Sequence, residues 1–120
     1  MEVLTSKYCL VFPDKWQGVA EAKSSRGTVV IRELMEEDSA YSGIVATLKT
    51  SRRRLPVSDT CEYLGALVSP SCGTFYLYAI YGEEGSCSED CSDLYWRVFD
   101  GLPPVFASIT PMGDFSWQPA

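Results

Sequence analysis

Cysteine supplies the most reactive side chains in this sequence, and two of the cysteines are spaced like neighbours on a helix. Cys87 and Cys91 are four residues apart, a separation that puts both side chains on one face of a helix. Such a pair could carry out thiol redox chemistry near a helix N-terminus, or supply half of a thiolate metal site. The interpretation we favour is core packing, because cysteine is commonly buried as a small hydrophobic residue and the chain has no CxxC pair.

Arginine forms the one basic run in the chain, Arg52-Arg53-Arg54. The protein has 10 Lys+Arg against 16 Asp+Glu, and therefore a formal net charge of −6. Guanidinium groups bind phosphate, carboxylate and acidic protein surfaces, whereas the simplest alternative is a solvated loop. Three arginines in an acidic chain do not predict nucleic-acid binding, so we expect a protein partner. The sequence identifies neither that partner nor the oligomeric state of this protein.

Histidine is absent, which excludes a Ser-His-Asp triad, a Cys-His dyad and any histidine-ligated metal within this chain. No Walker A, G-x-G-x-x-G or G-x-S-x-G motif is present either. We therefore expect a non-catalytic protein without a cofactor or metal site, and keep a small carboxylate-dependent enzyme as an alternative. Carboxylates occur in two runs that we assign to solvation and helix capping, since neither has EF-hand spacing: Glu33, Glu36, Glu37 and Asp38, then Glu83, Glu84, Glu89, Asp90 and Asp93.

Aromatic side chains lie on both sides of one predicted strand. Tyr76 and Tyr78 share one face, and Phe75 and Tyr81 share the other. One face must be core, and we expect the tail, with its Phe115 and Trp117, to cover the other one; a ligand platform is the alternative.

A single tryptophan falls beside the apolar stripe of the predicted C-terminal helix. Trp96 lies on the flank with Ser92 and Asp100, which predicts either an exposed contact for a partner or a side chain covered by the tail.

The elements that must position these residues are strands first and helices last. Residues 63–82 carry no charge, but a Ser-Pro-Ser-Cys-Gly turn at their centre favours two paired strands over a membrane span. Ser86 and Glu89 fit a capping box for a helix that reaches Leu102, and residues 105–110 can form a second short helix after Pro103-Pro104. Alternating or β-branched patterns predict six strands: residues 7–12, 19–23, 28–34, 44–49, 63–68 and 74–81.

This order predicts an α+β fold: a twisted antiparallel sheet of about five to six strands with the C-terminal helix packed on one face. With 120 residues, we expect one domain over residues 1–120, of which 111–120 form a C-terminal tail.

One segment near the N-terminus is similar to a known pattern, Tyr8-x-Leu10-x-Phe12-Pro13-x-x-Trp16-x-Gly18. It resembles the opening of small, mostly uncharacterised domains of Gram-positive (Firmicutes-type) bacteria, and the similarity extends over roughly residues 7–110. The same opening is similar to that of the fold shared by the photosystem II extrinsic protein and a Ran-binding import factor. The resemblance implies a twisted antiparallel sheet flanked by helices, and a binding or accessory role without catalytic residues.

The cysteine count bears on the compartment. The five cysteines cannot all pair within the chain, and no signal peptide follows Met1. We expect a cytoplasmic protein with free thiols if Met1 is the native start, and an extracytoplasmic protein otherwise.

Overall fold

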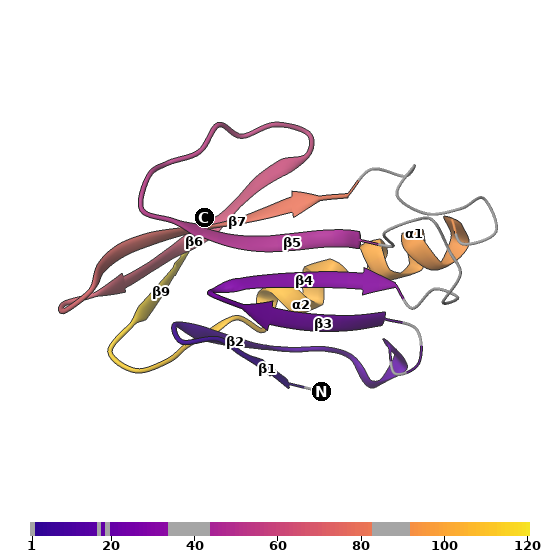
Figure 1. Cartoon of the computed structure of the whole chain (residues 1–120), viewed down its shortest axis with the longest axis horizontal. Helices are drawn as coiled ribbons and strands as arrows, with labels where there is room; N and C mark the ends of the chain where they lie inside the picture. Colours follow the sequence, from indigo (N-terminus) through magenta and orange to yellow (C-terminus); the bar gives the residue numbers. More distant parts are fainter. Residues whose placement is uncertain (1, 17, 19, 34–43, 83–91) are drawn as a thin grey trace.

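A six-stranded antiparallel sheet forms the larger part of the computed structural model, which describes residues 2–16, 18, 20–33, 44–82 and 92–120. Its strand order is β3-β4-β5-β7-β6-β9 (Figure 1). Five of the predicted strands lie in this sheet and are confirmed. The bounds are β3 Ala20–Ser25, β4 Thr28–Glu33, β5 Ile44–Ser51, β6 Cys61–Ser69, β7 Gly73–Tyr81 and β9 Ser116–Pro119.

The hairpin between β3 and β4 is determined by its local sequence. Arg26 and Gly27 form a two-residue turn in which both have positive φ, 51° and 81°. This geometry matches the right-handed twist of the flanking strands, and glycine adopts it without steric cost. The β-branched run that follows, Thr28-Val29-Val30-Ile31, favours the strand.

A second, smaller sheet corrects the expectation of a single sheet. It consists of β1 (Glu2–Leu4), β2 (Tyr8–Val11) and β8 (Thr110–Pro111), in the order β1-β2-β8. The strand predicted over residues 7–12 is therefore present but belongs to this sheet. The segment predicted to be a C-terminal tail, residues 111–120, supplies the edge strand β9 of the larger sheet.

Two short helices pack against one face of the larger sheet, as predicted, but the second begins three residues before the predicted range of 105–110, because the proline pair is accommodated in its first turn. Helix α1 spans Ser92–Asp100 and α2 spans Leu102–Ala107, with a 3-10 turn, η1, at Asp14–Trp16. Figure 1 shows α2 behind β3 and β4, so the viewer looks at the opposite face of the sheet. The predicted capping box at Ser86 and Glu89 lies outside the described residues. No helix within the described ranges is long and apolar enough to cross a membrane.

The hydrophobic core lies between the two sheets and the helices and unites them into one compact unit. Each part supplies completely or almost completely buried side chains, so neither sheet has a core of its own. The largest fully buried side chains are Tyr8, Leu10, Ile31, Leu48, Leu67, Leu77, Leu102, Val29 and Val45 from this core, and Tyr78 on the other face of the sheet.

Candidate interaction surface

The loop that contains the arginine run folds over the face of the larger sheet that the helices leave uncovered. The backbone N–H of Leu55 donates a hydrogen bond to the hydroxyl of Tyr78 over 2.8 Å, and Tyr78 is only 2% exposed. We call this uncovered side of the sheet the outer face. The loop over residues 52–60 is thus fixed to the outer face by a partly buried contact.

The tail covers the core side of the larger sheet, not the face with Tyr76 and Tyr78. Our expectation that Phe115 and Trp117 cover the face away from the core is therefore wrong. Phe115 packs edge-on against Phe75, with 6.0 Å between ring centroids, and both contact the main core. Trp117 pairs with Leu67 across β9 and β6 and also joins the core. The tail therefore completes the core, while the arginine loop covers the Tyr76–Tyr78 side.

The three arginines do not converge on one point. Arg54 lies on the outer face, with its guanidinium carbon 5.0 Å from the ring centroid of Tyr76 and 5.8 Å from that of Tyr63. Arg52 lies 4.8 Å from the ring centroid of Phe75, on the core side of β7. The arginine run therefore straddles the sheet, and only Arg54 has a defined contact with the outer tyrosines. Arg53 is exposed, and its backbone N–H donates to the Ser51 hydroxyl over 3.1 Å.

Strand register brings two further cations to the outer face, which sequence reasoning missed. Lys49 lies opposite Tyr78, which in turn lies opposite Tyr63, and directly opposite residues share a face. Lys23 reaches the same face one row away, opposite Val30. No short motif could have identified these lysines, because their place on the outer face follows from the pairing of β3 with β4 and of β5 with β7.

These cations have no negative partners within the part of the chain that the structure describes. The ion pair seen on the outer face joins Arg32 to Glu21 at 3.7 Å, and Lys23, Lys49 and Arg54 take no part in it. We call the set Lys23, Lys49, Arg54, Tyr63 and Tyr76 the basic sheet face. Its tyrosine rings lie 6.2 Å apart, and the arginine is held against both of them.

The thiol hypothesis rests on Cys87 and Cys91, which lie outside the described residues, as do most residues of the two acidic runs. The cysteines that the structure does describe are Cys9, Cys61 and Cys72, and all three are free thiols. Within the described ranges, no group of three or more candidate ligand side chains could hold a metal ion.

A cluster of hydroxyls around one carboxylate is a second feature that the sequence did not predict. Asp114 accepts hydrogen bonds from the Ser69 hydroxyl over 2.8 Å and from the Ser71 hydroxyl over 2.6 Å. These two bonds lower the pKa of Asp114 below its ordinary value. The Ser69 oxygen also accepts from the backbone N–H groups of Ser71 and Cys72, so the cluster ties the segment before β9 to the β6–β7 turn.

Trp96 is exposed, which is the first of the two alternatives for this side chain, rather than covered by the tail. It is 43% exposed, and its ring packs edge-on against Phe99 with 5.2 Å between centroids.

A cavity of about 340 Å³ opens between the β6–β7 hairpin and the helices, on the core side of the sheet. Sequence patterns gave no sign of this cavity, because its walls come from five separate elements: β6, β7, α1, α2 and β9.

The comparisons with known proteins give no indication of function. No family model, curated protein or solved structure is similar enough to this chain to count as a match. The resemblance of the N-terminal motif therefore stays a prediction.

Proposed function

We propose that this domain is a non-catalytic binding module that receives an acidic segment of a protein partner on the basic sheet face. The observation that carries the proposal is a set of three cations on the outer face, Lys23, Lys49 and Arg54, which form no ion pair with any residue that the structure describes, in a protein with net charge −6. Complementary charge steers encounter and selects partners, so a local positive surface on an acidic protein favours acidic ligands.

This surface contains arginine and tyrosine, two residue types that are enriched at protein interfaces. Arg54 is held over the rings of Tyr63 and Tyr76, which limits its freedom before any partner arrives. A guanidinium held in place loses less entropy when it forms paired hydrogen bonds to a carboxylate. The half-buried tyrosine rings add apolar contact area beside it.

A direct test uses a fluorescein-labelled peptide of ten glutamates and follows fluorescence anisotropy at low ionic strength. We expect saturable binding that weakens with added salt. The double substitution Lys49→Glu/Arg54→Glu should weaken binding by about tenfold or more, because charge-assisted hydrogen bonds each contribute roughly 1.5–3 kcal/mol.

The matched control is Lys15→Glu/Arg97→Glu, which makes the same change in net charge at two exposed residues outside the larger sheet. The proposal predicts that this control keeps most of the affinity. Equal losses of peptide affinity in both double variants would show a general effect of net charge and would contradict the proposed site. Absence of peptide binding to the native protein would refute the proposal.

A further inference from the structure

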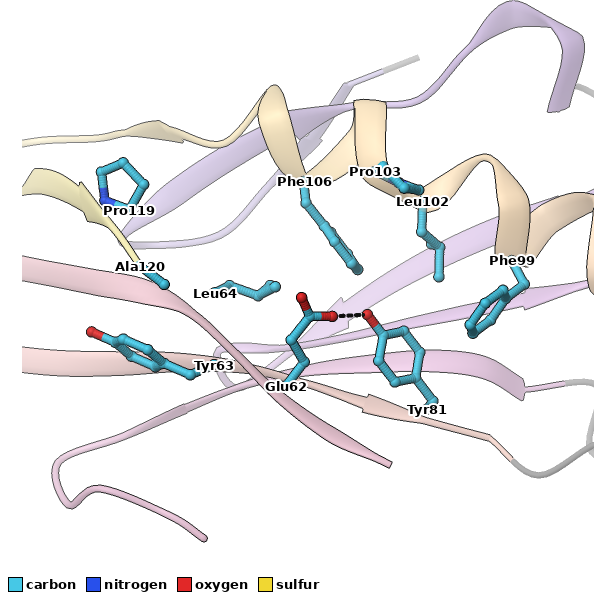
Figure 2. A pocket seen from close by; sticks show the side chains of 10 residues that line it. All are labelled: Glu62, Tyr63, Leu64, Tyr81, Phe99, Leu102, Pro103, Phe106, Pro119 and Ala120. Carbon is cyan, nitrogen blue, oxygen red and sulfur yellow. Dashed lines mark hydrogen bonds between the residues drawn. The ribbon is translucent and has the colours of Figure 1, made fainter. Parts of the chain in front are cut away.

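The cavity on the core side of the sheet is lined almost entirely by rings and aliphatic groups. Figure 2 shows the hairpin residues on one side and the residues of α1 and α2 on the other. Its apolar walls come from Leu64, Phe99, Leu102, Pro103, Phe106, Pro119 and Ala120, with the side chains of Tyr63, Tyr81 and Glu62 completing the lining.

Glu62 is the charged side chain among the lining residues of this cavity. The Tyr81 hydroxyl donates a hydrogen bond to Oε2 of Glu62 (Figure 2). Burial, and then this bond and the negative charge of Glu62, raise the pKa of Tyr81, so the phenol keeps its proton at neutral pH. The second oxygen of Glu62, Oε1, accepts no hydrogen bond from the residues that the structure describes.

We propose that this cavity binds a small organic ammonium ion, an amine carried on an aryl or alkyl body. Oε1 of Glu62 can accept a charge-assisted hydrogen bond from the ammonium group, and the aromatic rings attract a cation through their faces. The apolar walls receive the body of the ligand. A volume of about 340 Å³ falls within the usual range of small-molecule sites.

Other ligand charges fit this lining less well. An anion would meet the negative charge of Glu62 without any lysine or arginine among the lining residues. A purely apolar ligand would gain no interaction with the carboxylate of Glu62, which is exposed and would stay hydrated. An amine satisfies both the carboxylate and the apolar walls.

Apart from Tyr63, which borders both, this site lies on a different side of the sheet from the basic sheet face. Glu62 and Tyr81 lie on the core side, since Glu62 pairs with Ala79 and Tyr81 with Ala46, both of which belong to the core. Tyr63, Tyr76 and Arg54 meet on the outer side. The two sites therefore select ligands of opposite charge, and the amine site can fail or hold without affecting the proposed binding module.

The experiment compares three ligands of similar size by isothermal titration calorimetry: phenethylamine, 2-phenylethanol and phenylacetate. We expect saturable one-to-one binding of phenethylamine, binding of 2-phenylethanol weaker by about tenfold or more, and no binding of phenylacetate. Glu62→Gln should weaken phenethylamine binding by a similar factor and leave the alcohol almost unaffected. Glu2→Gln, which removes one exposed carboxylate from β1, is the matched control and should change neither.

Several outcomes would overturn the proposal. Equal affinity for the amine and the alcohol would mean that charge is not recognised, and absence of saturable phenethylamine binding would mean that the cavity is not a ligand site. Equal effects of Glu62→Gln and Glu2→Gln would place the amine elsewhere. The ligand comparison uses the unaltered protein, so it decides the matter even if Glu62→Gln perturbs the fold.

Discussion

Asp114 shows how one side chain joins parts of the chain that no local pattern connects. Its carboxylate receives the hydroxyls of Ser69 and Ser71, more than forty positions earlier in the sequence. The Ser-Pro-Ser turn was visible in the sequence, whereas its partner could be known only once β9 was placed beside β6. The same reasoning holds for the binding surface: the arginine run was evident, but Lys23 and Lys49 join Arg54 only through strand register.

The lowered pKa of Asp114 predicts a pH-dependent contribution to stability. A carboxylate with a folded-state pKa below its ordinary value of 3.8 stabilises the folded protein above that value. This contribution is lost as the pH falls through the folded-state pKa. We expect Asp114→Asn to lower the urea midpoint at pH 7, and the difference from the native protein to shrink towards pH 3.

The matched control for this substitution is Asp59→Asn, at an exposed carboxylate in the arginine loop. It should change the urea midpoint little at either pH. A constant difference between Asp114→Asn and the native protein across this range would contradict the assigned role of the carboxylate.

Element by element, the strands with strong patterns were predictable and the short edge strands were not. Strands β3 to β7 follow β-branched or alternating runs, and the proline pair Pro103-Pro104 lies in the first turn of the second helix, which begins at Leu102. Strands β1, β8 and β9 have two to four residues each, and two of them contain proline. Such segments become strands because a neighbouring edge is available, and the division into two sheets follows from that pairing rather than from local propensity.

Strand β9 depends on a close approach at Gly65. A β-carbon at this position would lie 2.6 Å from both the backbone oxygen of Gln118 and the ring of Trp117, and the residue has a φ of 153°. We expect Gly65→Ala to lower the free energy of unfolding by about 1–3 kcal/mol through overpacking, in addition to the backbone cost. Urea denaturation would measure the loss.

Gly73→Ala provides the comparison, since Gly73 also has a positive φ, 92°, but nothing lies within 4 Å of an added β-carbon. It should cost only about 1 kcal/mol of backbone strain. Equal losses for the two variants would show that the approach of β9 does not limit residue 65.

For the whole molecule, the shared core predicts that the two sheets unfold together. Leu10, in the smaller sheet, is completely buried in the same core as the larger sheet. Leu10→Ala should lower the free energy of unfolding by about 2–5 kcal/mol. Tryptophan fluorescence and far-ultraviolet circular dichroism should still give coincident transitions, as in a two-state domain.

Leu4→Ala is the control, because Leu4 lies in the same sheet but is 54% exposed. Its effect should stay within about 0.5 kcal/mol. Separate transitions for the two probes in Leu10→Ala would mean that the sheets are independent units.

Positive charge is concentrated on one face of the part of the molecule that the structure describes. The basic sheet face is positive while the protein as a whole has a net charge of −6, so the remaining surface carries the excess negative charge. In the field of the proposed acidic partner, we expect such a molecule to experience a torque as well as repulsion. The torque should turn the outer face towards the partner before contact, so that the fraction of collisions in a productive orientation rises, and with it the association rate constant.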